Sequence, residues 1–351
     1  MRIALDAMGG DHAPERPVDG ALAALGGPER DFEVVLVGDE PRLSPLLPRG
    51  TGVERLTIRH APEVIGMEES PAAALRKKRN SSITIGIGLQ KTGVADAFVS
   101  AGNTGAVMAA ALTTLGRIEG IARPAIVTVF PTQRDPCLVL DVGANAECKP
   151  HHLAQFALMG HIYAVEVLGR ERPRIGLLSI GEEVGKGNDL TIAAHRLMAD
   201  SGLNFIGNVE GRDVLRGAAD VVVTDGFTGN VLLKFGESFV DFMASEVGRE
   251  IHSSRRASLG VWLMGPAFRR LKRRIDYAEY GGAPLLGVDG IVIICHGSST
   301  VKAFRNAMRV ARRAVARDLA GRIERAMRGS GSTSGRSTGA DEPLGTRIEA
   351  S

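Results

Sequence analysis

Glycine-containing polar segments follow seven of the apolar runs in this chain, and they hold most of the side chains that could do chemistry. Glycine lets backbone N–H groups approach a ligand closely, and a helix that begins just after such a turn presents free N–H groups. The carboxyl ends of parallel strands share one edge of a sheet, so we expect the segments to form one anion site there, of the kind that binds phosphate. They are DAMGGDHAP (6–14), SAGNTGA (100–106), DVGAN (141–145), SIGEEVGKGN (179–188), NVEGRD (208–213), TDGFTGN (224–230) and HGSS (296–299).

Two of these segments precede helical patterns and are the predicted phosphate turns. Asn103 or Thr104 could cap the first helix and leave neighbouring N–H groups for an anion, although a plain N-cap is an equally good interpretation. Lys234 follows the second turn and could add a positive charge or be a solvated helix lysine. The predicted phosphate-binding residues are Gly102, Asn103, Thr104, Gly226, Thr228, Gly229, Asn230 and Lys234.

Catalytic candidates lie in the other segments. Lys186 stands between two glycines and could follow a phosphate or a developing oxyanion, although most loop lysines do neither. His296 could donate to a reacting carbonyl or be a satisfied core histidine. Asp11 beside His12 suggests acid–base work, against the commoner case of a turn-capping aspartate and a surface histidine. Asn188 completes the catalytic set, and the predicted substrate-orienting residues are Asn208 and Glu210.

Several other site classes find little support. There is no G-x-S-x-G elbow, no Walker A motif and no G-x-G-x-x-G after a strand. Cys137 and Cys295 lie within apolar runs and are interpreted as core residues, and with Cys148 they match no disulfide framework, which favours a reducing cytoplasm. His151 and His152 would need acidic partners to hold a metal, so no metal is predicted. The net charge of +3 gives no case for nucleic acid.

Short apolar runs alternate with helix-length patterns, which predicts a three-layer α/β/α sandwich with a mostly parallel sheet. We expect a single catalytic domain over 1–328 and a disordered tail over 329–351, which is rich in Gly, Ser and Thr. The predicted strands are 2–7, 33–38, 57–60, 97–100, 125–130, 137–141, 174–180, 204–208, 221–225 and 290–296. The predicted helices are 14–25, 71–91, 104–115, 150–168, 190–200, 229–250 and 298–328.

A basic amphipathic segment over 249–275 is the candidate membrane contact. Apolar residues recur there at helical spacing opposite a cluster of arginines and lysines, and Gly265-Pro266 should break the helix. Packing on the core or on a dimer partner is the more usual fate of such a stripe, but the dense basic cluster favours an anionic bilayer. The predicted contacts are Leu259, Val261, Trp262, Leu263, Met264, Phe268 and Leu271.

The ordered set of segments resembles the bacterial phosphate acyltransferase family, the acyl-ACP:phosphate transacylases. The segments that carry the resemblance run from about residue 1 to about residue 320, and they include DGFTGNVLLK (225–234) and YGGAPLLGVDG (280–290). The resemblance implies a cytoplasmic homodimer that is peripherally bound to the inner face of the cell membrane and needs no cofactor. It also implies a fold similar to isocitrate and isopropylmalate dehydrogenases and to phosphate acetyltransferases. The acyl phosphate product would pass to a membrane glycerol-3-phosphate acyltransferase for phospholipid synthesis.

The implied reaction makes phosphate itself the nucleophile, so no covalent intermediate is needed. The enzyme must hold phosphate against the thioester of acyl carrier protein, stabilise the oxyanion and assist the departing thiol. YGGAPLLGV (280–288) is the candidate lining of an acyl groove. One alternative is a metal- and NAD-dependent decarboxylating dehydrogenase, with Asp220, Asp225 and Glu210 as metal ligands. A second is a non-catalytic membrane-associated scaffold, which the dense polar turns argue against.

Overall fold

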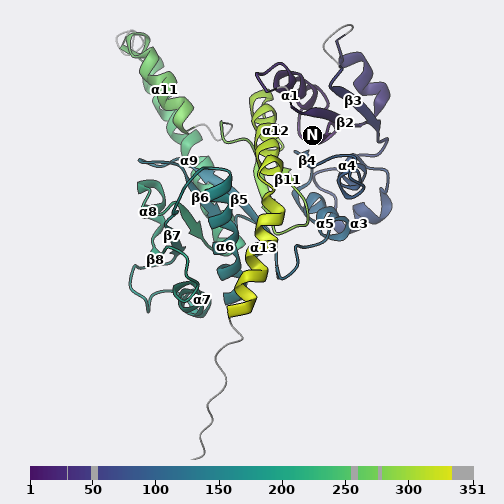
Figure 1. The fold of residues 1–351 in the computed structure, drawn as a ribbon. Helices are drawn as coiled ribbons and strands as arrows, with labels where there is room; N and C mark the ends of the chain where they lie inside the picture. The colour runs from purple at the N-terminus through teal and green to yellow at the C-terminus, as the bar shows by residue number, and fades with distance from the viewer. Residues whose placement is uncertain (30, 49–53, 254–259, 276–278, 334–351) are drawn as a thin grey trace, which may run out of the picture.

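The computed structural model describes residues 1–29, 31–48, 54–253, 260–275 and 279–333. Within them one eleven-stranded sheet runs in the order β3-β2-β1-β4-β11-β10-β5-β6-β9-β7-β8, with helices on both faces (Figure 1). The predicted three-layer, mostly parallel α/β fold is therefore confirmed. The strands are β1 (Arg2–Asp6), β2 (Glu33–Gly38), β3 (Leu56–His60), β4 (Ala97–Ser100), β5 (Ala125–Phe130), β6 (Cys137–Leu140), β7 (Ile175–Leu178), β8 (Phe205–Val209), β9 (Val221–Val223), β10 (Ala283–Leu286) and β11 (Val292–Ile294).

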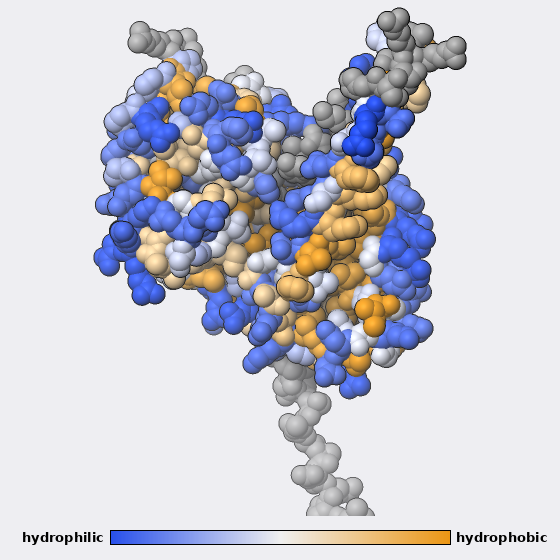
Figure 2. All heavy atoms as spheres, turned by 180° about the vertical axis from the view of Figure 1, so that it is seen from behind, coloured by the Kyte–Doolittle hydropathy of each residue, from blue (hydrophilic) through white to orange (hydrophobic). Residues whose placement is uncertain are grey.

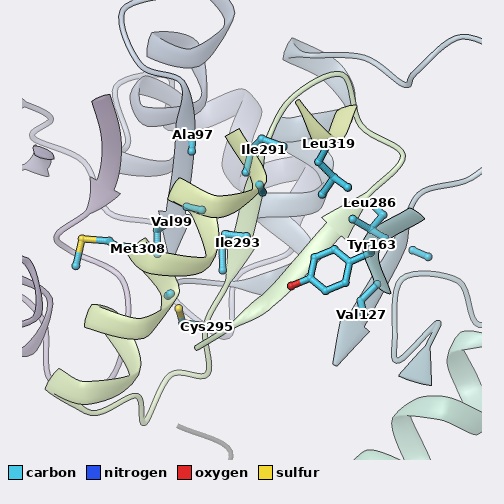
Figure 3. Packing of buried hydrophobic residues seen from close by; sticks show 14 of the residues in the cluster. Ala97, Val99, Val127, Tyr163, Leu286, Ile291, Ile293, Cys295, Met308 and Leu319 are labelled. Carbon is cyan, nitrogen blue, oxygen red and sulfur yellow. The ribbon is translucent and has the colours of Figure 1, made fainter. Parts of the chain in front are cut away.

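Each face of the sheet has its own apolar core, because successive side chains of a strand point to opposite faces. One cluster packs under α1, α6, α7, α12 and α13, and the other packs under α3, α4, α5 and α8. Figure 3 shows part of the first, where Val99 of β4 and Ile293 of β11 lie near Met308 of α12. The buried runs read from the sequence are therefore strands covered on both sides.

The strands reverse direction in the middle of the sheet, which corrects the expectation of one shared edge. β10 is antiparallel to both β11 and β5, and β5 is antiparallel to β6. The strands β1, β4 and β11 consequently run opposite to β6, β9, β7 and β8. DAMGGDHAP, SAGNTGA and HGSS leave the sheet at one edge, while DVGAN, SIGEEVGKGN, NVEGRD and TDGFTGN leave it at the other.

Two predicted helices are each broken into two, and the second part of one of them extends beyond its predicted end. The 71–91 pattern forms two helices, the second capped by Ser81, whose Oγ accepts from Thr84 N at 3.3 Å. The 298–328 pattern breaks at Asp318, which has φ +49°. The second part continues to Thr333, five residues past the predicted domain end, and 334–351 lie outside the described residues. The helices are α1 (Glu15–Leu25), α2 (Glu40–Leu43), α3 (Pro71–Lys77), α4 (Ser82–Lys91), α5 (Thr104–Thr114), α6 (Pro150–Glu166), α7 (Asp189–Ala199), α8 (Gly211–Arg216), α9 (Gly226–Ser253), α11 (Gly265–Ile275), α12 (Val301–Ala316) and α13 (Leu319–Thr333), with a 3₁₀ turn at Ser44–Leu46.

The segment predicted as an acyl groove, 280–288, instead supplies a strand that the sequence reading missed. Leu285 and Leu286 of β10 are buried in the sheet, so they line no open groove. Only Tyr280, Gly282 and Ala283 reach the large cavity described below. The groove assignment is therefore wrong for most of this segment.

The helices α9 and α11 form an arm that leaves the body of the molecule (Figure 1). Helix is interrupted at Met264 and α11 begins at Gly265, which agrees with the predicted break. Trp262, Leu263 and Met264 are 75%, 67% and 56% exposed, and Leu271 is 54% exposed. Leu259, also predicted to contact a membrane, lies outside the described residues. Among the helices of the described chain, none has the length and apolar character needed to span a bilayer.

Candidate active site

A buried carboxylate joins the first two polar turns. Asp6 is 1% exposed and accepts hydrogen bonds from Ser100 Oγ at 2.6 Å and from Met8 N at 3.0 Å. Ser100 Oγ in turn accepts from Gly102 N at 3.0 Å. Burial raises the pKa of Asp6, and the hydrogen bond from Ser100 acts in the opposite direction. Asp6 therefore fixes DAMGGDHAP against SAGNTGA at this edge of the sheet.

The HGSS turn lies beside the first turn. Asp11 N donates to Gly297 O at 2.8 Å, and Arg16 Nη1 donates to Ser298 O at 3.1 Å. The structure therefore brings the Asp11–His12 pair to the turn that carries His296. Asp11, His12 and His296 are all exposed, so their side chains are accessible to a ligand.

Asn103 has the plain capping role that was one of its two interpretations. Its Oδ1 accepts from Ala106 N at 3.0 Å and caps α5. Its Nδ2 donates to the carbonyl groups of Gly66, Met67 and Glu69. The amide group is thus fully engaged within the protein, and Thr104 rather than Asn103 reaches the cavity.

A second buried carboxylate organises the opposite edge. Asp141 accepts from Ile126 N, Ala144 N and Asn145 N, the last at 2.7 Å, and burial raises its pKa. Gly226 N donates to Asn145 O at 2.8 Å. A Cβ atom at Gly229 would lie 1.9 Å from Asp141 O, so only glycine fits there. Close contact with the 141–145 turn therefore explains why Gly226 and Gly229 are both glycines.

Helix α9 starts from this second turn and crosses to the first edge. Thr228 is engaged in the cap, since its N and Oγ1 both contact the Asp225 carboxylate at 2.8 Å. Asn230, Lys234 and Glu237 follow at steps of four and three residues, which places them on one face of the helix. All three line the cavity between α9 and the sheet.

Lys234 and His296 meet in that cavity. Lys234 Nζ lies 3.4 Å from His296 Nε2 and 2.9 Å from Glu237 Oε2. On the other side of the ring, Ser298 N donates to His296 Nδ1 at 3.2 Å, and Ser298 Oγ lies 2.8 Å from the same atom. A backbone N–H can only donate, so Nδ1 is an acceptor and the proton of the neutral imidazole is on Nε2. Two N–H donors therefore face one another.

The cavity has a volume of about 860 Å³, and its lining residues fall into two chemical groups, called here its polar wall and its apolar wall. Its polar wall is formed by Thr104, Asn230, Lys234, His296, Ser298 and Ser299. Its apolar wall includes Ile126 and Phe130 of β5, Val214 and Leu215 of α8, and Leu233 and Phe239 of α9. Such a cavity can hold a polar reacting group at one wall and a hydrocarbon chain at the other.

The remaining catalytic and orienting candidates lie on elements at the other edge. Lys186 is exposed, and Asn188 Oδ1 caps α7 by accepting from Thr191 N at 2.9 Å. Asn208 Nδ2 donates to Glu183 O at 2.9 Å and so holds the SIGEEVGKGN loop. Glu210 pairs with Arg212 at 3.0 Å. None of these four residues lines the cavity that holds His296, although Glu210 pairs with Arg212, which does, and the roles of all four stay predictions.

Three charged residues of the cavity, Arg212, Glu237 and Asp241, were missed by the sequence reading. Glu237 pairs with Lys234, and a spacing of three residues on a predicted helix could have suggested this contact. Arg212 lines the cavity from α8, a helix too short to show in the sequence pattern.

The carboxylates proposed for a metal site are committed to separate contacts. Asp220 pairs with Arg174 at 3.1 Å, Asp225 caps α9, and Glu210 pairs with Arg212. In the part of the chain that the structure describes, no group of three or more His, Cys, Asp or Glu side chains could hold a metal ion.

Known proteins share this fold and sequence. Two phosphotransacetylase structures, from Staphylococcus aureus and Streptococcus pyogenes, match 90% of this chain and 94% of their own at TM-scores of 0.58 and 0.59, with 16% and 18% identity. That likeness shows the fold alone.

The sequence relatives are much closer. A family model described as fatty acid synthesis protein matches residues 1–322. The phosphate acyltransferase of Heliobacterium modesticaldum is 54% identical over 326 residues, covering 92% of this chain and 97% of the relative. That of Pelotomaculum thermopropionicum is 53% identical over 315 residues, covering 90% and 92%. The chain therefore belongs to the phosphate acyltransferase family of fatty acid synthesis proteins, and it is an enzyme that transfers acyl groups to phosphate.

Proposed function

We propose that this acyltransferase takes a fatty acyl group from acyl-ACP and gives acyl phosphate for phospholipid synthesis. The observation that carries the proposal is the meeting of Lys234 and His296 at the polar wall of a cavity whose other wall is apolar. A fatty acyl thioester needs both environments within one site, whereas a polar substrate would leave the apolar wall without a use.

Phosphate is the ligand that best satisfies the polar wall. Lys234 can only donate, and His296 Nε2 carries the ring proton, so their 3.4 Å approach lacks an acceptor. If Lys234 instead donated to Nε2, the ring proton would move to Nδ1 and the bond from Ser298 N would be lost. A phosphate oxygen bound to both groups removes this conflict and adds charge-assisted hydrogen bonds.

The chemistry then needs no covalent enzyme intermediate. A phosphate oxygen attacks the thioester carbonyl carbon, a C–O bond forms and the C–S bond breaks. The proton of HPO₄²⁻ is lost as the acyl phosphate forms and is taken up by the departing thiolate, so the step balances without a net proton from the enzyme. His296 Nε2–H can stabilise the carbonyl oxygen as it becomes negative. Lys234 holds the nucleophile in place, and Asn230 extends the same wall.

The carrier protein would approach at the basic rim of the cavity. Arg212 lines the cavity, and its side chain is 60% exposed. Arg274 is exposed and donates to Thr132 O and Gln133 O at 3.3 Å, and Gln133 N donates to the carbonyl oxygen of Leu215, which lines the cavity. Positive charge at this rim fits a phosphopantetheine arm, because the arm is joined to its carrier through a phosphodiester.

The decisive experiment is incubation with palmitoyl-ACP, with and without phosphate. We expect free carrier thiol only when phosphate is present, together with acyl phosphate that hydroxylamine traps. Thiol release without phosphate would identify a thioesterase and reject the proposal. Activity that EDTA abolishes and magnesium restores, with a change in NADH absorbance, would favour the dehydrogenase alternative.

Peripheral attachment to the cytoplasmic face of the membrane is part of the proposal, because the acyl phosphate is passed to a membrane glycerol-3-phosphate acyltransferase. The exposed Trp262, Leu263 and Met264 support it, since tryptophan and neighbouring apolar residues favour the membrane interface. Exposed Arg269 and Arg270 on α11 can contact anionic lipid.

We also propose a homodimer. Figure 2 shows apolar side chains in a band along the projecting arm. Helix α9 exposes Phe227, Val231, Phe235 and Phe242, which are 66%, 53%, 68% and 56% exposed. Contiguous exposed apolar residues of this kind usually mark an interface, and a second copy would cover them. Light scattering should give twice the chain mass, and Phe242→Glu should yield monomers.

A further inference from the structure

An acidic side chain stands beside Lys234 in the cavity, and the reaction described above does not use it. Glu237 Oε2 lies 2.9 Å from Lys234 Nζ, and both residues line the cavity. The side chain of Glu237 is 28% exposed, so it is partly shielded from solvent. Lys234 Nζ also lies 3.4 Å from His296 Nε2. A carboxylate is therefore held next to the two groups that the proposed function assigns to phosphate.

This carboxylate is close enough to a bound anion to influence which anion binds. A phosphate oxygen that accepts a hydrogen bond from Lys234 Nζ lies within about 6 Å of Glu237 Oε2, because both contact the same nitrogen. The ammonium group of Lys234 has three N–H donors, so Glu237 can stay in place when phosphate binds. Two negative groups at this separation repel one another. A phosphate site beside a carboxylate therefore needs a contact that offsets the repulsion.

The hydroxyl group of hydrogen phosphate supplies that contact. HPO₄²⁻ carries one P–O–H donor and three unprotonated oxygens, whereas sulfate at neutral pH has unprotonated oxygens only. An ionised carboxylate accepts hydrogen bonds and donates none, so Glu237 can accept from the hydroxyl group of phosphate and finds no donor on sulfate. Hydrogen bonds to an ionised acceptor are among the stronger ones. The other phosphate oxygens remain available to accept from Lys234 and His296 and to attack the thioester.

We propose that Glu237 is the specificity-determining residue of the anion site, and that it selects hydrogen phosphate over sulfate by accepting a hydrogen bond from the P–O–H group. This inference rests on the proposed function and adds the residue that chooses the nucleophile. Sulfate closely matches HPO₄²⁻ in shape and charge, so two donors such as Lys234 and His296 do not distinguish the two anions. A site built to hydrogen-bond a hydroxyl group rejects an analogue that lacks it, because the acceptor then faces a bare negative oxygen.

The test measures the binding of both anions at pH 8, where phosphate is mainly HPO₄²⁻. Equilibrium dialysis of radiolabelled phosphate, with sulfate as competitor, gives a dissociation constant for each anion without any acyl donor. Wild type should bind sulfate roughly 100-fold more weakly than phosphate. In Glu237→Gln the side-chain amide can donate to sulfate, so the ratio of the two constants should fall roughly 10-fold or more, the effect of one hydrogen bond to a charged group. The substitution keeps the size of the side chain, and thermal unfolding checks that the variant is folded.

The matched control is Asp241→Asn, one helical turn further along α9. Asp241 lines the same cavity, so this variant removes one negative charge and leaves the Lys234–Glu237 pair unchanged. Sulfate and HPO₄²⁻ carry the same charge, so the change should affect the binding of both alike and preserve their ratio. An equal fall of the ratio in Asp241→Asn and Glu237→Gln would overturn the proposal. So would a wild type that binds both anions equally, or a ratio for Glu237→Gln within two-fold of wild type.

Arsenate tests the hydroxyl group separately from the size of the anion. HAsO₄²⁻ is larger than HPO₄²⁻ and carries the same kind of hydroxyl donor. It should therefore compete with labelled phosphate far better than sulfate does in wild type. Exclusion of arsenate to the same extent as sulfate would show that the site selects by size, and would reject the role of Glu237.

Binding and transfer together separate this inference from the proposed function. If wild type prefers phosphate to sulfate but never releases thiol from palmitoyl-ACP, the proposed function fails, and selection by Glu237 is still judged from the binding ratios. If phosphate-dependent transfer is normal and Glu237→Gln keeps the wild-type ratio, selection by Glu237 alone fails.

Discussion

Lys234 Nζ lies 3.4 Å from His296 Nε2, although the two residues are 62 positions apart and follow strands that run in opposite directions. His296 follows β11, and Lys234 is carried to it by α9, which starts after β9. The helix therefore joins the polar turns of the two sheet edges at one point.

Removing either partner should have a distinct kinetic effect. Lys234→Ala should raise KM for phosphate roughly 10-fold, because it removes a charge-assisted contact to the ground-state anion. His296→Ala should lower kcat by roughly 10²-fold or more, because its Nε2–H stabilises the carbonyl oxygen in the transition state. Asn230→Ala should act mainly on KM for phosphate. Lys77→Ala removes an exposed lysine outside the cavity and serves as the control.

Lys186 gives a second prediction from the sequence. If it stabilises transition-state charge, Lys186→Ala should lower kcat roughly 10²-fold with folding intact. Since Lys186 does not line the cavity that holds His296, this result would require the loop after β7 to move toward the reacting group. Steady-state kinetics at saturating phosphate is the measurement. Activity within a few-fold of wild type would make Lys186 a solvated loop lysine.

Asp141→Ala should destabilise the fold strongly. It leaves the buried N–H groups of Ile126 and Asn145 and the half-buried N–H group of Ala144 without an acceptor, and each buried group costs about 1–3 kcal/mol. We expect the free energy of unfolding to fall by at least about 3 kcal/mol in urea titrations. Asp225→Ala removes only an exposed helix cap and should cost about 1 kcal/mol. Equal losses of unfolding free energy in Asp141→Ala and Asp225→Ala would contradict the organising role of Asp141.

Cys295 should behave as a core thiol in spite of its place next to His296. Burial raises its pKa to about 12, so the thiolate is absent at neutral pH and forms only as the pH approaches that value. Figure 3 shows it packed beside Ile293 within the core. Iodoacetamide at pH 8 should leave it unmodified, as judged by mass spectrometry, and Cys295→Ala should keep phosphate-dependent transfer. Rapid modification would show that the thiol is accessible.

Membrane binding should depend on the arm. Trp262→Ala with Phe268→Ala should release the protein from anionic liposomes while turnover of soluble acyl-ACP stays nearly intact. The control is Leu197→Ala with Ile206→Ala, which removes two side chains that are 44% and 42% exposed on α7 and β8. If the Trp262 variant still sediments with liposomes, or if it unfolds, the contact lies elsewhere.

The sequence by itself determined the layered α/β fold, most strand positions and the family. Buried strands are continuous apolar runs, and amphipathic helices repeat every three to four residues, so both are visible locally. The strand β10 was missed because APLL is short and glycines precede it, which is typical of a loop. The break at Asp318 was missed because the helical pattern continues across it.

Only the tertiary structure decided which polar turns meet. Strand order and the reversal at β10, β5 and β6 come from pairings between residues far apart in the chain, such as Leu285 with Ile126, and no local pattern encodes them. For that reason Lys186 was grouped with His296 on sequence but stands at the other edge. The approach of Lys234 to His296 arises in the same way, because it exists only where the helix that starts after β9 reaches the turn after β11.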